Sequence, residues 1–239
     1  MTRQPSTGAR IRNAPGRPRR RRRLRWAVAG LAVLAVLAVA AIALFISQPS
    51  PPPLTLPAGA PAAPSGPASG TWQVSPGSVA GFRIQETALG FSNDVVGRTS
   101  RVTGTIVISG DQVTGATLRI GLAAIKVGGK TEPQLAKSLR TRQFPSATFT
   151  LTRPVNLGPA FIAGKIITVT AAGVLDLRGT EHAVTVRISA RRDGQALQAA
   201  GSIPVSFADW GIKGPGGPGF LGSLAHHGVA EFLLTLHRS

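Results

Sequence analysis

The chain has 239 residues, with 27 Lys and Arg against nine Asp and Glu and a formal net charge of +18. Ten of the basic residues lie within residues 1–25, which contain no acid, so more than half of the net charge is confined to a tail. A nucleic-acid-binding protein would carry such charge on one folded face, so the segregation argues for membrane topology instead. The absence of cysteine excludes disulfides, thiolate metal sites, cysteine nucleophiles and a lipidated N-terminal cysteine.

An uncharged segment follows the arginine-rich tail. Residues 26–46 contain neither a charge nor a proline, and as a transmembrane helix they span about 31 Å, which matches the hydrocarbon core of a bilayer. Arginines flank only the N-terminal side, since no charge follows before Arg83. The positive-inside rule therefore predicts a single-pass protein of the cell membrane, with residues 1–25 in the cytoplasm and the C-terminal part extracytoplasmic. A cleaved signal peptide is the alternative, because Ala41 and Ala43 form a small-x-small site, but the apolar run continues beyond it.

Residues 47–70 have the composition of a linker. They contain eight prolines, and Ala, Ser and Gly make up most of the remainder. Such a segment cannot bury a core, so it is expected to be extended and polyproline-like. At about 3.1 Å per residue, a free spacer of this kind would hold the following domain up to roughly 70 Å from the bilayer.

Residues 71–239 carry the pattern of a β domain. Short runs rich in Val, Ile, Thr and Phe show period-two alternation and are separated by glycine-containing turns. The clearest case is a predicted hairpin of Val102–Ile108 and Val113–Leu122, joined by a turn over Ser109–Gln112. In its second strand the predicted inward residues are Ala116, Leu118 and Ile120, and the predicted outward residues are Thr117 and Arg119.

One short helix is predicted in this domain, over Glu132–Leu139, with Pro133 in its first turn. It is too short to carry a fold. Many antiparallel strands with almost no helix indicate an all-β domain, either a sandwich or a closed barrel of about eight strands.

The residue types needed for catalysis are poorly represented. The four histidines are His182, His226, His227 and His237. None forms the i, i+4 pair of a helical metal site, and no carboxylate cluster accompanies them. The sequence also lacks a nucleophile elbow, a phosphate-binding loop and a dinucleotide fingerprint. We therefore expect no enzyme activity, no metal and no cofactor.

Several stretches of the β domain, taken in order, resemble the YceI-like family. The opening resembles it in TWQV and SVAGFRI (Thr71–Val74 and Ser78–Ile84), and the second hairpin in VTGTIVI (Val102–Ile108). The most specific stretches are RQFPSATFTLT (Arg142–Thr152) and GVLDLRGTEHAVTVRI (Gly173–Ile188), followed by SFADWGI (Ser206–Ile212) and EFLLTL (Glu231–Leu236). The anchored, proline-linked form is similar to the version found in high-GC actinobacteria.

This resemblance implies a lipocalin-like barrel that binds a long apolar ligand, such as a polyisoprenoid, an isoprenoid quinone or a fatty acyl lipid. A barrel of eight strands either is filled by its own side chains or holds one slender ligand. A filled barrel that serves as a protein-interaction module outside the membrane therefore remains the alternative. The predicted ligand-binding residues are Phe82, Ile84, Ile106, Ala116, Leu118, Ile120, Phe149, Leu151, Leu177, Val186, Ile188, Trp210, Phe220, Phe232 and Leu234.

The chain departs from the family pattern in two places. The Arg-Asp pair that usually precedes the family's helix is replaced here by Lys130, Thr131 and Glu132, and a long glycine-rich loop occupies residues 214–228. Four arginines near predicted strand or helix ends are candidates for a phosphate or carboxylate headgroup, although solvated surface arginines are the simpler interpretation. These are Arg98, Arg101, Arg140 and Arg142.

Overall fold

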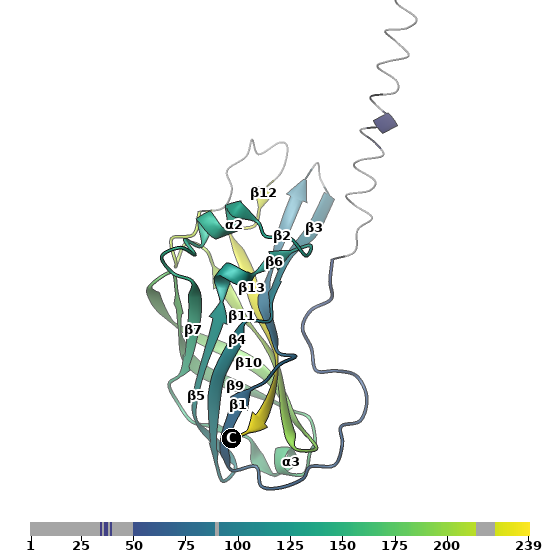
Figure 1. Ribbon diagram of the computed structural model, residues 1–239, viewed down its shortest axis with the longest axis vertical. Coiled ribbons are helices and arrows are strands. Elements are labelled where there is room, and N and C mark those ends of the chain that lie inside the picture. The colour runs from purple at the N-terminus through teal and green to yellow at the C-terminus, as the bar shows by residue number, and fades with distance from the viewer. Residues whose placement is uncertain (1–33, 35, 38, 40–49, 89–90, 214–222) are drawn as a thin grey trace, which may run out of the picture. The chain divides into compact units, whose positions relative to one another are not determined.

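The computed structural model describes residues 50–88, 91–213 and 223–239, together with four helical residues, Leu34, Val36, Leu37 and Val39 (Figure 1). The chain forms two compact units, Met1–Pro49 and Ser50–Ser239. Apart from those four residues, the predicted tail and membrane span lie outside the described part of the chain. Among the described residues, no helix has the length and apolar character needed to cross a membrane.

The second unit is built from strands. Its helical segments are short, namely η1 (Leu122–Ala124), α2 (Pro133–Ser138) and α3 (Gly158–Ile162). The strands are β1 (Gly70–Val74), β2 (Val79–Ala88), β3 (Phe91–Thr99), β4 (Val102–Ser109), β5 (Gln112–Gly121), β6 (Lys126–Val127), β7 (Ser146–Leu151), β8 (Val155–Asn156), β9 (Ile167–Leu177), β10 (Thr180–Asp193), β11 (Ala196–Ser206), β12 (Ser223–Leu224) and β13 (His227–Arg238).

Eight of these strands close into an antiparallel barrel. Their order is β1-β4-β5-β7-β9-β10-β11-β13, and β13 pairs again with β1, where Val74 lies opposite Leu236. The pairing of β13 with β1 closes the ring, so the edges of these two strands are covered where they meet. The all-β domain expected from the alternating pattern is therefore confirmed, and it is the barrel that the family resemblance implied rather than a sandwich.

The two ends of the barrel differ (Figure 1). At one end, which we call the α2 end, lie α2, β12 and the tip of a hairpin in which β2 pairs with β3. At the other, the α3 end, lie α3, the β10–β11 turn and the C-terminus. Strand β13 has two neighbours on the same side: its first half pairs with β2, and its second half pairs with β1.

Local predictions agree closely with these elements. The predicted hairpin is formed by β4 and β5, with a bulge between Val107 and Ile108. The predicted helix Glu132–Leu139 becomes α2, for which Glu132 is the N-cap and Leu139 the C-cap. Helix α3 was not predicted, because its five residues, GPAFI, include a glycine and a proline and carry almost no helical periodicity.

The proline-rich segment differs from the expectation. Residues 50–69 lack regular secondary structure, as predicted, but they are held along the outside of the barrel rather than extending away from it as a free spacer. We call this segment the strap. Hydrogen bonds fix it because arginine and acidic side chains of β2, β3, β10 and β13 reach its backbone. These partners are more than thirty residues away along the chain, so composition alone did not reveal them.

Candidate functional site

The barrel encloses a cavity of about 460 Å³. That volume lies within the range of about 300 to 1,000 Å³ that is typical of small-molecule pockets. Aliphatic and aromatic side chains form nearly all of the wall. An apolar wall without ordered polar groups holds water poorly, so the space is suited to an apolar ligand.

Most of the residues predicted to bind a ligand lie on this wall. Strand alternation explains the result: Ile106 of β4 pairs with Ala116 of β5, and Leu118 pairs with Phe149 of β7, so neighbouring strands present apolar side chains at the same level. Contact between these residues and a ligand remains a prediction. The predicted residues found on the wall are Phe82, Ile84, Ile106, Ala116, Leu118, Ile120, Phe149, Leu151, Leu177, Val186, Ile188, Phe232 and Leu234.

The remaining two predicted residues are not placed on the wall. Trp210 is only 3% exposed and packs outside the cavity, where its indole N–H donates to the Thr180 carbonyl over 3.0 Å and His182 meets its ring edge to face. A tryptophan whose N–H is satisfied in this way is a packing residue, whereas the sequence predicted it among the ligand-binding residues. Phe220 lies outside the described residues.

The α3 end of the cavity is closed. Trp72, Phe161 and Leu236 are almost completely buried there, and the Trp72 indole N–H donates to the Ala68 carbonyl over 2.8 Å. Phe161 belongs to the unpredicted helix α3 and lines the cavity from below. The helix therefore positions an aromatic plug that prevents the pocket from passing through the barrel at this end.

The α2 end is where the cavity meets solvent. The polar wall residues Glu132, Gln134 and Lys213 at this end are exposed, whereas Val155, Leu157 and Phe161 of the wall at the α3 end are buried. Beneath them, Leu135 and Leu139 of α2 point into the cavity. These two leucines are four residues apart, a spacing that places both on one face of a helix. That spacing could have identified them from the sequence as residues of the cavity wall. We call this opening the mouth.

The polar candidates do not converge on a second site. Within the described residues, no group of three or more His, Asp or Glu side chains is arranged to hold a metal ion. Arg101 and Arg142 are exposed, Arg140 lies over the ring of Phe144, and Arg98 forms an ion pair with Glu231. The four arginines thus do not form one headgroup site.

Two sequence stretches that resemble the family meet on the barrel wall. Strand β7 supplies Phe149 from RQFPSATFTLT, and the adjacent strand β9 supplies Gly173 from GVLDLRGT. A Cβ atom added at Gly173 would lie 2.3 Å from ring atoms of Phe149 and 2.6 Å from the Thr150 carbonyl oxygen. Glycine is therefore required at position 173, because any side chain there would clash with the phenyl ring of Phe149 on the wall.

This packing makes a testable prediction. Gly173→Val is expected to lower the free energy of unfolding by about 1 to 3 kcal/mol, because the Phe149 ring must leave its position. The matched control is Gly115→Val on β5, where an added Cβ meets nothing within 4 Å. Urea unfolding of both variants measures the difference. Equal stability of the two variants would show that the contact with Phe149 is not the reason why glycine is needed at position 173.

Comparison with known domain families finds a match to the YceI-like domain over residues 72–228. The match covers more than half of the chain and includes the barrel from β1 to the start of β13. The chain belongs to the YceI-like family. YceI-like domains are binding proteins and are generally non-enzymatic. The comparison with curated proteins finds no match.

Several solved structures are similar to this chain. A polyisoprenoid-binding domain from Saccharophagus degradans, implicated in plant cell wall breakdown, is 15% identical, with 72% of this chain and 99% of that chain covered and a TM-score of 0.54. BcnA of Burkholderia cenocepacia is 14% identical (64% and 95% covered, TM-score 0.49), and the Campylobacter jejuni YCEI protein is 11% identical (64% and 90% covered, TM-score 0.46). At 15% identity, the similarity to the first of these structures concerns the fold alone.

Proposed function

We propose that this YceI-like protein sequesters or carries a long-chain apolar lipid, such as a polyisoprenoid, an isoprenoid quinone or a fatty acyl chain, outside the cytoplasm. The observation that carries the proposal is the closed-ended apolar cavity of about 460 Å³ inside the barrel. The polyisoprenoid-binding domain with the same fold supports it. A filled barrel that only binds proteins would have no cavity inside it, so the cavity also disfavours this alternative.

The affinity would come mainly from burial of the ligand. Removing about 300 Å² of a polyprenyl chain from water contributes roughly 7 kcal/mol before ordering costs, at about 25 cal/mol per Å². No strong polar contact is needed for binding of that strength. Selection would then depend on the length and girth of the chain, since the plug at the α3 end limits how far a ligand can enter.

Native mass spectrometry of residues 50–239, purified without organic solvent, tests the proposal. We expect an added mass of several hundred daltons that solvent extraction removes and that returns when a polyprenyl lipid is supplied. The segment is suitable because Ser50–Ser239 forms one compact unit. Unliganded protein that also fails to take up polyprenol, quinone or fatty acid would reject the carrier and favour the interaction module.

The proposed location is the outer face of the cell membrane, with residues 26–46 as anchor and residues 1–25 in the cytoplasm. The arginine flank supports this orientation. A periplasmic or surface reporter fused after Ser239 should be active, and neutral replacement of Arg19 to Arg23 should reduce that activity by weakening the orientation. Activity of a cytoplasm-specific reporter in the unaltered chain would contradict the proposed topology.

A further inference from the structure

The strap is fixed to the barrel along its length. Near its start, the Ser50 hydroxyl donates to the Asn93 side chain over 2.7 Å and to the Asp94 carbonyl over 2.8 Å. Just beyond, Arg83 donates to the Pro51 carbonyl over 2.6 Å, and the Leu54 amide donates to a carboxylate of β13 over 2.9 Å. These contacts all lie on the outer face of β2, β3 and β13.

The second half of the strap is held at the α3 end. Arg191 donates to the Gly59 carbonyl over 3.0 Å, and Arg192 donates to the Ser65 and Gly66 carbonyls over 3.1 and 2.6 Å. Both arginines are buried and belong to β10. The strap therefore runs from the β2–β3 hairpin toward the α3 end, where it enters β1 (Figure 1).

This direction determines where the chain enters the compact unit. Ser50 is bound to β3 at residues 93 and 94, close to the tip of the β2–β3 hairpin, which belongs to the same end of the barrel as the mouth. Only three residues separate Ser50 from Ile46, the last residue of the predicted membrane span. Four residue steps reach at most about 14 Å. A docked strap therefore removes most of the roughly 70 Å of reach that a free linker of this composition would have.

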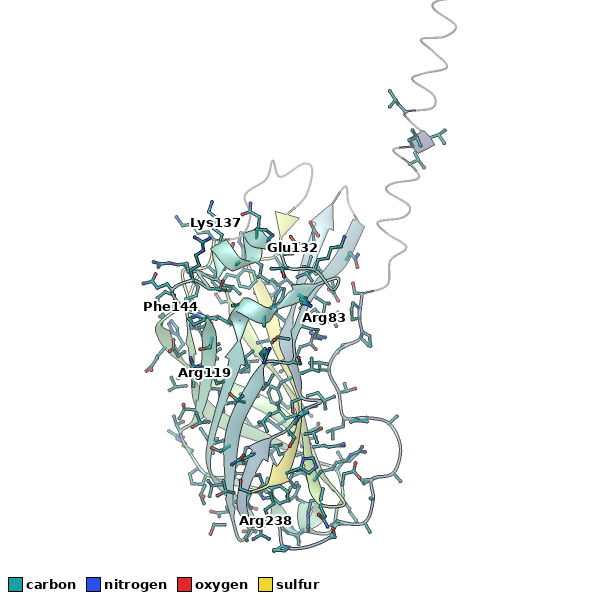
Figure 2. All side chains as sticks on the ribbon, in the orientation of Figure 1. Arg83, Arg119, Glu132, Lys137, Phe144 and Arg238 are labelled. Atoms are coloured by element: carbon teal, nitrogen blue, oxygen red, sulfur yellow. The ribbon has the colours of Figure 1, made fainter. Side chains whose placement is uncertain are left out.

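The α2 end also carries the charge that a membrane surface attracts. Residues 126–142, which contain β6 and α2, include five exposed basic side chains and a single acid, Glu132. Figure 2 shows Lys137 and Glu132 together at this end and Arg238 at the opposite one. Of the other acids at the α2 end, Glu181 and Asp209 are exposed, whereas Glu86, Asp94 and Asp176 are half-buried. The basic residues are Lys126, Lys130, Lys137, Arg140 and Arg142.

We propose that the docked strap and this basic segment hold the mouth of the pocket against the anionic headgroups of the membrane in which the chain is anchored. A lipid then passes between bilayer and cavity without crossing bulk water, whereas a free linker would let the mouth turn in any direction. Basic side chains close to a bilayer are attracted by its anionic lipids, which adds to the tether. The inference rests on the proposed function, but it makes a separate geometric claim.

The test uses the full-length chain, which lacks cysteine, in vesicles of phosphatidylcholine and phosphatidylglycerol that contain an acceptor-labelled lipid. Thr131→Cys places a donor dye beside α2, and Gln195→Cys places it in the β10–β11 turn; both positions are exposed. The ends of a strand as long as β13 are about 40 Å apart. We expect several-fold higher energy transfer from position 131 than from position 195. Equal transfer, or the reverse order, would overturn the proposal.

Charge reversal tests the contribution of the basic segment. Lys130→Glu combined with Lys137→Glu should reduce transfer from position 131, and the reduction should disappear in vesicles of phosphatidylcholine alone. The matched control reverses Arg153 and Lys165, two exposed basic residues at the α3 end. The same reduction in the control pair would contradict a headgroup contact at the mouth.

The geometric claim and the proposed function fail in different ways. Energy transfer depends on the distance from each dye to the bilayer, so it reports orientation whether or not the cavity binds a ligand. If transfer follows the expected order but mass spectrometry detects no bound lipid, the orientation stands and the carrier function is rejected. If lipid is bound but position 195 gives the higher transfer, the orientation is rejected alone.

Discussion

Replacing Glu231 with alanine is expected to lower the free energy of unfolding of residues 50–239 by about 3 kcal/mol. The Glu231 side chain faces outward from β13 but is only 5% exposed, because the strap covers it. One carboxylate oxygen accepts the Leu54 N–H, and the other lies 2.7 Å from Arg98 Nη1 and 3.6 Å from Arg83 Nε. The latter oxygen has no aligned hydrogen-bond donor, so its contacts are ion pairs. Alanine would leave two guanidinium groups beneath the strap without this counter-charge (Figure 2 labels Arg83).

The matched control is Asp94→Ala. Asp94 also forms an ion pair with Arg83, at 2.8 Å, but its side chain is 36% exposed. Solvent screens such a pair, so its removal should cost less than about 1 kcal/mol. Urea unfolding measures both variants. Equal costs would indicate that burial by the strap contributes nothing to the Glu231 interaction.

A shorter chain measures directly how much the strap contributes to the Glu231 interaction. In residues 71–239, which lack the strap, Glu231 should be open to solvent, and Glu231→Ala should cost far less than in residues 50–239. The coupling between strap removal and substitution then measures the energy that the strap contributes at this position. Additive effects would mean that the strap does not dock in solution.

Most of the inner wall could be predicted because period-two alternation reports directly on which side chains face inward, whereas the choice of a barrel over a sandwich came from the family resemblance. In β10, for example, Val186 and Ile188 alternate with Arg187 and Ser189, and the structure places only the first two on the cavity wall. That pattern could not reveal whether the interior was hollow. Cavity volume depends on how far apart opposite walls lie, and strand number and tilt determine this rather than the local sequence.

The strap could not be predicted because its stabilising partners are distant in sequence. Its prolines and small residues indicate an extended chain, and the structure agrees on that point. Docking depends on Arg83, Arg191 and Glu231, each of which looks in the sequence like an ordinary solvated residue on the outer face of a strand. Only the barrel topology brings them under one segment, so composition predicted the conformation of the strap but not its position.

Ala116→Phe is expected to abolish most co-purified lipid while changing the free energy of unfolding by less than about 1 kcal/mol. Ala116 is half-buried and lies on the cavity wall opposite Ile106, so a phenyl ring would occupy space that the ligand uses. In a filled core, the same substitution would overpack the interior and cost about 1 to 3 kcal/mol, with no lipid to lose. Stability and ligand content therefore respond in opposite ways under the two interpretations.

The neighbouring residue provides the control for this substitution. Thr117 is exposed, faces outward and pairs with Thr105, so Thr117→Phe adds the same bulk to the same strand without entering the cavity. Lipid content is measured by mass spectrometry of untreated protein, and stability by thermal unfolding of extracted protein. We expect Thr117→Phe to retain the lipid of the unaltered chain. Destabilisation by Ala116→Phe, with no lipid in any of the three proteins, would lead us to abandon the carrier for a protein-interaction module, because a barrel that resists added bulk has no room for a polyprenyl chain.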